Sequence, residues 1–74
     1  MEDVIKTVIK TTLNWEDYTI LNKSPLKDGK DWDSVNQLRV LMALESELNV
    51  KVSIKKFINC ANVSEIANLI NVAQ

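Results

Sequence analysis

Glycine and proline are almost absent from this chain of 74 residues, which contains one of each. Tight hairpin turns depend on these two residues, so their scarcity disfavours β-hairpins and favours helices joined by polar loops. The length suits one domain, and we expect residues 1–74 to form it. A deep catalytic cleft is hard to build on so small a core. The sequence therefore favours binding or carrying over catalysis.

The charged and reactive residues exclude several classes of function. The chain has no His, the commonest general base and zinc ligand, and Cys60 is its only cysteine. We therefore predict no catalytic residue, no disulfide and no metal site. The formal net charge of -1 offers no broad attraction to nucleic acid or to anionic membranes. The opening MEDVIKTVIK resembles neither a signal peptide nor a membrane span, so we expect a cytoplasmic location.

Hydrophobic periodicity predicts two main helices in the first two thirds of the chain. Residues 2–13 repeat apolar side chains at helical spacing. Residues 14–33 show no period but contain scattered apolar residues, which predicts a long loop pinned against the core. Residues 34–48 contain neither Gly nor Pro and follow Asp33, a good N-cap. The buried stripe of this helix is expected at Val40, Leu41, Leu44 and Leu48.

The last third of the chain predicts a short helix and a longer one. Ser53 can cap a brief helix over residues 54–60, whose buried side chains we expect to be Ile54, Phe57 and Ile58. Asn62 can cap the last helix, with Glu65 at the third helical position as in a capping box. The predicted fold is thus all-α, a four-helix bundle with a long first loop and a short third helix.

The segment DSVNQLRVLMALESELNVKVS, which begins at Asp33, resembles the acyl and peptidyl carrier proteins. That family has Asp-Ser-Leu at the start of its second helix and a Leu-Glu pair near the end of it. Here Asp33, Ser34, Val35, Leu44 and Glu45 fall at the matching positions without a gap. The resemblance covers nearly the whole chain, including the long loop.

The resemblance implies a role for Ser34 and a set of partners. Ser34 would carry a covalent phosphopantetheine arm, added from coenzyme A by a phosphopantetheinyl transferase, with Asp33 beside it. Acyl or aminoacyl intermediates would ride on the arm as thioesters and pass between loading and downstream biosynthetic enzymes. Such a helix start also suits an anionic phosphodiester, because unpaired N–H groups and the helix dipole point toward it. We expect a monomer that is not itself an enzyme.

The docking surface for partner enzymes is expected beside the arm. Val35, Arg39 and Met42 share one helix face, and Trp32 precedes the Asp-Ser pair. The competing interpretation is a solvated face with its edges tucked into the core, and a Trp32 that packs the loop onto the bundle. We expect Cys60 to be a small buried hydrophobic residue rather than a reactive thiol.

Several positions depart from the family pattern. Asp31 stands where the family often has Gly, and Trp32 stands where small or aliphatic residues are common. Asn36 and Arg39 occupy places that are often acidic in fatty-acid carriers. These departures favour a carrier of a specialised pathway, such as polyketide or nonribosomal peptide biosynthesis, over the general fatty-acid carrier.

Other classes of function fit the sequence less well. The same bundle could be a protein-interaction module that carries no prosthetic group, with Ser34 acting only as a helix-start residue. A small DNA-binding domain would need a helix lined with Lys or Arg, which is missing. Asp28, Asp31 and Asp33 invite a calcium loop, but the twelfth position of that pattern is Arg39 instead of Glu.

Overall fold

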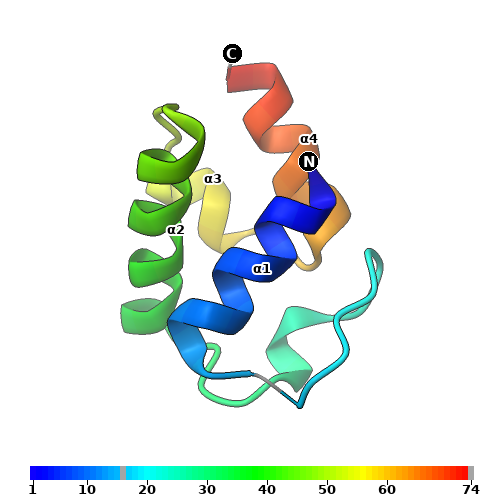
Figure 1. The fold of residues 1–74 in the computed structure, drawn as a ribbon. Helices are drawn as coiled ribbons and strands as arrows, with labels where there is room; N and C mark the ends of the chain where they lie inside the picture. The colour runs from blue at the N-terminus through cyan, green and yellow to red at the C-terminus, as the bar shows by residue number, and fades with distance from the viewer. Residues whose placement is uncertain (16, 74) are drawn as a thin grey trace.

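The computed structural model describes residues 1–15 and 17–73 and confirms the all-helical fold (Figure 1). In chain order its elements are α1 (Glu2–Leu13), the 3₁₀ turn η1 (Leu26–Asp28), α2 (Ser34–Leu48), α3 (Ile54–Ile58) and α4 (Val63–Ala73). The described residues include no strand. α1 packs against α2 and α4, and the short α3 packs against the same two helices. The four helices form a bundle 31 × 22 × 20 Å in extent.

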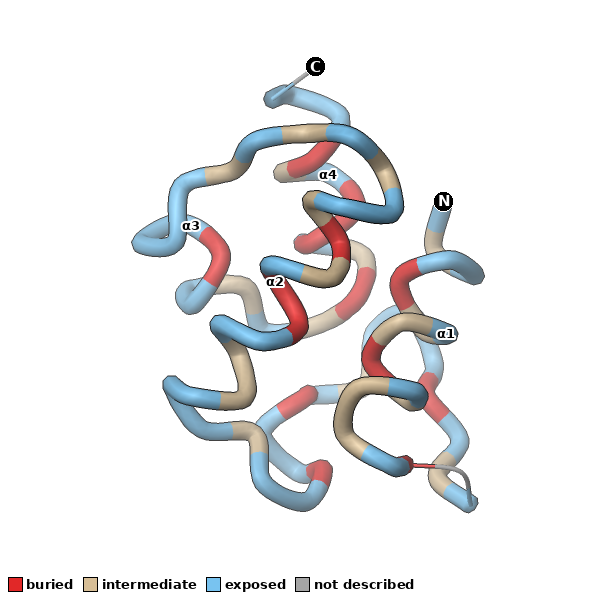
Figure 2. Tube along the Cα trace, turned by 60° about the vertical axis from the view of Figure 1, so that its left-hand side comes forward, coloured by how far each residue is buried: buried red, intermediate tan, exposed pale blue. Residues whose placement is uncertain are grey.

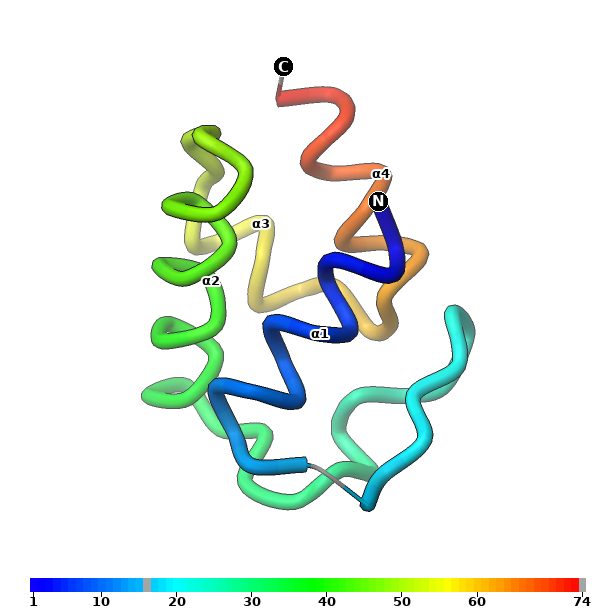
Figure 3. The backbone as a smooth tube through the Cα atoms, in the orientation of Figure 1, coloured from blue at the N-terminus to red at the C-terminus, as the bar shows by residue number. Residues whose placement is uncertain are grey.

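The direction of the helices decides where the start of α2 lies. α1 descends from the end of the bundle that holds both termini, and α2 climbs back toward it (Figure 1, Figure 3). The C-terminal end of α1, the long loop and the N-terminal end of α2 therefore meet at the opposite end (Figure 3). Within the described residues, no helix is long and apolar enough to cross a membrane.

The helix starts use the predicted capping residues. The Asp33 carboxylate accepts a hydrogen bond from the backbone N–H of Asn36 at 2.9 Å, and so caps α2. The Ser53 hydroxyl accepts from a backbone N–H of α3 at 3.4 Å, and the Asn62 side chain accepts from the N–H of Glu65 at 2.9 Å. The Glu65 carboxylate returns a bond to the N–H of Ala61 at 2.8 Å. The predicted capping box is thus present, but its return bond reaches one residue further back than Asn62.

The two long helices that frame the site both end at asparagine. Asn14 after α1 and Asn49 after α2 have φ values of 59° and 55°, in the left-handed region. Their backbone N–H groups bond to the carbonyls of Lys10 and Glu45, which closes the last turn of each helix. Asparagine tolerates this conformation better than most residues, so it ends a helix in a chain that has almost no glycine.

The hydrophobic core runs between the helices, as one buried stripe on each (Figure 2). α2 contributes Val40, Leu41 and Leu44 as predicted, while Leu48 at its end is half-buried. The remaining helices contribute a further set of buried side chains, namely Ile5, Ile9, Phe57, Val63, Ile66, Ala67 and Ile70. These stripes leave the outer surface of α2 to solvent.

The long loop is pinned to the core, as predicted. Trp15, Ile20 and Leu26 are buried, while Leu21 points to solvent. The backbone N–H of Leu26 donates to the carbonyl of Ala61 at 2.9 Å, and another loop carbonyl accepts from the N–H of Ser64 at 3.0 Å. The loop is therefore bonded to the link between α3 and α4 and to the first turn of α4, as well as packed against the core.

The expectation for α3 was partly wrong. The helix ends at Ile58, two residues earlier than predicted, and Phe57 alone of its apolar residues is buried. Ile54 and Ile58 remain 41% and 44% exposed. A helix of five residues has room to press only one side chain deeply into the core, so its other residues form a rim around Phe57.

Candidate functional site

Ser34 is the first residue of α2 and lies exposed at the end of the bundle away from the termini. No hydrogen bond to another described residue engages its hydroxyl. A buried or inward-facing hydroxyl would have excluded attachment of a large group. The observed position instead leaves the oxygen accessible to an external enzyme.

The start of α2 favours negative charge next to Ser34. The first N–H groups of a helix have no partner within it, and the helix dipole adds partial positive charge there. Asp33 uses its carboxylate on the N–H of Asn36, and the Asp33 carbonyl accepts from the N–H of Gln37 at 2.8 Å. The N–H groups of Ser34 and Val35 make no bond to another described residue. A phosphodiester on Ser34 would find these donors close by, so the residues present fit an anionic group.

A chain of hydrogen bonds fixes the approach to Ser34. The side-chain amide of Asn36 donates to the carbonyl of Asp31 at 2.9 Å, and its oxygen accepts from Arg39 at 2.9 Å. The Arg39 guanidinium also donates to the carbonyl of Thr12 at 3.3 Å, near the end of α1. This chain joins the loop, α2 and α1 around the serine. Arg39, expected as a docking residue, is exposed but already has these two intramolecular partners.

The backbone of Asp31, at the position where the family often has glycine, takes a conformation that favours glycine. Its φ is 62°, in the left-handed region that glycine adopts without penalty. Its carbonyl accepts from the N–H of Asp33 at 2.9 Å as well as from the Asn36 side chain. The backbone makes a sharp turn here, and this turn directs the chain into the start of α2.

An aromatic cluster of Trp15, Trp32 and Phe57 packs between the turn at Asp31 and the core. The Trp15 indole N–H donates to the carbonyl of Lys30 at 2.8 Å, and its ring centroid lies 6.0 Å from that of Trp32. Trp32 in turn lies 6.4 Å from Phe57 in the core. Trp32 therefore packs the loop onto the bundle, as the plainer of its two interpretations predicted. It is half-buried, so part of its ring remains accessible.

Gly29 is required by this cluster. A Cβ at Gly29 would stand 2.2 Å from Cη2 and 2.5 Å from Cζ2 of Trp15. Its φ of −79° is open to any residue, so the need is for space and not for an unusual backbone angle. The Trp15 ring lies directly on the glycine backbone.

The expected docking residues lie on the outer side of α2. Val35 is 70% exposed and Met42 is 60% exposed, and Arg39 lies between them along the helix. Apolar side chains this exposed contribute little to the core of the free protein. The site residues Ser34, Asp33 and Val35 thus lie together at the helix start, while Met42 lies about two turns further along.

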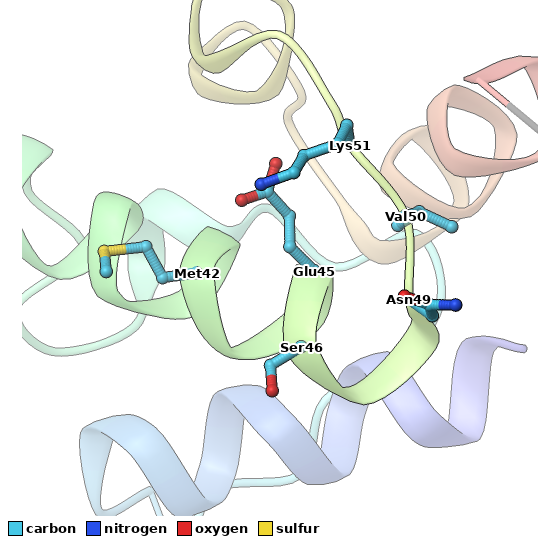
Figure 4. Close-up of a pocket in the computed structure, with 6 residues that line it drawn as sticks. All are labelled: Met42, Glu45, Ser46, Asn49, Val50 and Lys51. Carbon is cyan, nitrogen blue, oxygen red and sulfur yellow. The ribbon is translucent and has the colours of Figure 1, made fainter.

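Several hollows lie along α2, and two of them bear on the site. One lies between the long loop, the first turns of α2 and the end of α3, and Trp32, Gln37, Ile58 and Cys60 are among its lining residues. The other lies at the far end of α2, where Glu45 and Lys51 point toward one another above the helix (Figure 4). Its residue nearest to Ser34 in the sequence is Met42, eight residues further along α2. The first hollow is therefore the one beside Ser34.

The remaining candidate group near the site is the thiol of Cys60. Burial, and secondarily the charge of Glu65, raise the pKa of the Cys60 thiol, which makes it less reactive. Cys60 is half-buried, as expected of a small hydrophobe. The described residues contain no group of three or more His, Cys, Asp or Glu side chains placed to hold a metal ion.

Sequence reasoning missed two residues that shape the site. Asn36 was noted only as a departure from an acidic position, yet its amide holds the turn at Asp31 and orients Arg39. An Asn in the first turn of a helix is a signal for such a side-chain bond. Gln37 lines the hollow beside Ser34, and only its spacing of three residues from Ser34 could have indicated this.

Comparisons with known proteins identify the family and the fold of the chain. The family model described as the phosphopantetheine attachment site matches residues 3–70. Among solved structures, "a putative acyl carrier protein" from Mycobacterium tuberculosis superposes with a TM-score of 0.81 at 24% sequence identity. The match covers 96% of this chain and 95% of the other, and at that identity it shows the shared fold alone. No curated protein matches this chain closely enough in sequence to count as a relative.

Proposed function

The chain belongs to the family of phosphopantetheine-attachment domains, and from this premise we propose that Ser34 is the residue that takes the arm. A domain of this family is a carrier, not an enzyme, and its prosthetic group is covalent phosphopantetheine. The observation that carries the assignment is the position of Ser34. Its hydroxyl is exposed at the start of α2, one residue after the Asp33 cap, where the N–H groups of Ser34 and Val35 are open to a phosphate.

The chemistry of attachment asks little of this chain. A phosphopantetheinyl transferase supplies the catalytic groups, and coenzyme A supplies the arm. Ser34 Oγ forms the new bond to phosphorus, its proton leaves to the transferase, and the nucleotide part of coenzyme A departs. Asp33 and Asn36 hold the helix start in place, so that the oxygen meets the transferase in one orientation. The arm, once attached, supplies a terminal thiol on which a cargo can be held as a thioester.

We further propose that the cargo is an acyl or aminoacyl intermediate of a specialised pathway. The support is the surface of α2, whose first half carries no acidic residue and exposes Arg39. An enzyme with a basic patch made for an acidic helix would meet this cation unfavourably. Polyketide and nonribosomal peptide biosynthesis are two specialised pathways of this kind. We place the loading and downstream enzymes of such a pathway among the partners, and we propose a cytoplasmic monomer.

The docking surface proposed for these partners comprises Val35, Arg39 and Met42, with Trp32 beside it. Val35 and Met42 offer apolar area that the free protein leaves in solvent. Methionine adapts its shape to different partners, which suits a carrier that visits several enzymes.

Intact mass spectrometry tests the attachment site. The purified chain, incubated with coenzyme A and a broad-specificity phosphopantetheinyl transferase, should gain the mass of one arm. Ser34→Ala should gain none. Ser46→Ala is the matched control, since Ser46 is an exposed serine on the same helix, and this variant should load like the parent chain. Loading of Ser34→Ala, or loss of loading in Ser46→Ala, would contradict the proposal.

A further inference from the structure

Asp28 and Gly29 form the one Asp-Gly pair of the chain. Aspartate followed by glycine is the aspartate sequence most prone to close into a cyclic imide, because glycine has no side chain to keep its backbone nitrogen away from the carboxyl group. The pair lies at the end of η1, where Asp28 is exposed and Gly29 is buried. No hydrogen bond or ion pair to another described residue engages the Asp28 carboxyl group, so this group is free to move.

The reaction open to such a pair is isomerisation through the imide. The Gly29 nitrogen attacks Cγ of the Asp28 carboxylic acid, a C–N bond forms, and one carboxyl oxygen leaves as water with the two protons of the nitrogen and the acid. Water then adds to the imide. Opening at Cγ restores aspartate, whereas opening at the main-chain carbonyl carbon gives isoaspartate, whose backbone runs through Cβ and Cγ. One water is lost and one is gained, so the mass of the chain is unchanged.

The folded loop withholds the nitrogen that this reaction needs. The N–H of Gly29 donates to the carbonyl of Leu26 at 2.9 Å, which closes the turn. The Trp15 ring lies on the glycine, with Cη2 only 2.2 Å from the place that a Cβ of Gly29 would occupy. The indole N–H also holds the carbonyl of the next residue, Lys30, at 2.8 Å. The nitrogen can reach Cγ of Asp28 only after the turn has opened and the ring has moved away.

The product does not fit the folded loop either. Isoaspartate at position 28 adds one atom to the main chain between Leu26 and Gly29, so the bond that closes the turn would have to span a longer ring. The displaced backbone would press on the Trp15 ring, which leaves no room for even one added carbon at Gly29. The folded state therefore favours aspartate over isoaspartate.

From these contacts we infer that Asp28–Gly29 is a modification site controlled by the loop, which isomerises from the open loop and whose isoaspartate form keeps the loop from closing. The rate of such a reaction is the rate in the unfolded chain multiplied by the fraction of time that the loop is open. Because Gly29 is buried and hydrogen-bonded, we expect the folded chain to isomerise about tenfold more slowly than the unfolded chain, or slower still.

An isoaspartate-specific methyltransferase with labelled S-adenosylmethionine measures the product. The chain is kept for days at 37 °C and neutral pH, folded or in guanidinium chloride, and is then transferred to one buffer for labelling. Asp28→Glu should remove most of the signal of the unfolded chain, because glutamate would have to close a larger ring. Asp3→Glu is the matched control at another exposed acid and should keep the signal. A signal that persists in Asp28→Glu would overturn the site, and equal rates in the folded and unfolded chain would overturn its control by the loop.

Two aromatic residues of the loop test the role of the ring. Trp15→Phe removes the indole hydrogen bond and should speed isomerisation of the folded chain about fivefold, the factor expected from loss of one hydrogen bond. Tyr18→Phe keeps a ring beside Trp15 and should leave the rate unchanged. Equal rates in the two variants, with circular dichroism showing both to be folded, would contradict the inference.

The isoaspartate form itself tests the second half of the inference. Separated from the parent chain by reversed-phase chromatography and refolded, it should melt roughly 5–20 °C lower, as expected for a backbone that no longer fits beneath Trp15. An unchanged Tm would show that the loop accommodates isoaspartate and would overturn this part. Attachment at Ser34 plays no part in these measurements, so their outcome is independent of the function proposed above.

Discussion

Replacement of Gly29 by alanine should destabilise the whole domain, because the Trp15 ring lies against the glycine backbone. The added Cβ would stand 2.2, 2.5 and 2.8 Å from three carbons of the indole. The ring has little freedom to move away. Its N–H donates to the Lys30 carbonyl at 2.8 Å, and Tyr18 and Trp32 flank it at centroid distances of 5.1 and 6.0 Å.

The expected cost follows from these contacts. Over-packing a tight site costs about 1–3 kcal/mol, and loss of the indole hydrogen bond adds about 1 kcal/mol. A total of about 2–4 kcal/mol is a large part of the roughly 4–11 kcal/mol expected for a domain of this length. A change of 1 kcal/mol moves the midpoint of such a domain by about 4–8 °C, so Tm should fall by roughly 8–30 °C. Circular dichroism at rising temperature and urea titration measure both quantities.

A double-mutant cycle isolates the physical cause. Phenylalanine lacks the outer carbons that the new Cβ would strike, so Gly29→Ala should cost less than about 1 kcal/mol in a Trp15→Phe background. An equal cost of Gly29→Ala in both backgrounds would refute the reasoning, because the clash with the indole could not then be its source.

Three further predictions concern the turn, the docking face and the thiol. Asp31→Gly should raise the free energy of unfolding by up to ~1 kcal/mol in urea titration, because glycine adopts a φ of 62° without strain. Both hydrogen bonds at Asp31 are to its backbone carbonyl, so the substitution keeps them. A fall in the free energy of unfolding would contradict this prediction. Met42→Asp should lower kcat/KM for arm transfer by about tenfold or more, while the control Val72→Asp, at a side chain that is even more exposed, should leave it unchanged. Equal effects of the two substitutions would remove Met42 from the docking face. Cys60 should be alkylated more slowly than a free thiol at pH 8, since burial raises the pKa of its thiol. Glu65→Gln should speed this alkylation, because it removes a nearby negative charge but keeps a side-chain oxygen that can accept from the N–H of Ala61. An unchanged rate in Glu65→Gln would show that this charge does not act on the thiol.

The helices and their ends could be predicted from the sequence because their signals are local. Asp33, Ser53 and Asn62 each cap the helix that they were expected to cap, since a side chain reaching the N–H three residues ahead depends on nothing distant. The exposure of Ile54 and Ile58 could not be predicted in this way. Helical spacing gives a face, but how deep that face lies depends on the space left by α2 and α4.

The shape of the site could not be predicted from local sequence patterns either, because it depends on contacts between residues that are distant in the sequence. Asn36 and Arg39 read as surface residues, yet together they tie the loop to the end of α1 through contacts up to 27 residues apart. Similarly, Gly29 stands 14 residues from the ring that needs it. Spacing within one element does not reveal such partners. Ser34 could be proposed as the attachment residue because the family pattern has a serine at a helix start, and Ser34 is the first residue of α2.

The presentation of Ser34 depends more on the loop than on the helix that bears it. A helix start alone would leave the serine free to fray, since the first residues of a helix lack the full set of backbone bonds. Here the Trp15 indole fixes Lys30, the left-handed turn at Asp31 follows, and Asn36 binds that turn back to α2. Perturbations that loosen the loop should therefore slow arm transfer even where α2 stays helical. Gly29→Ala supplies the test at a temperature where it remains folded: its rate of loading should fall below that of Asp31→Gly, and an equal rate would mean that α2 alone presents the serine.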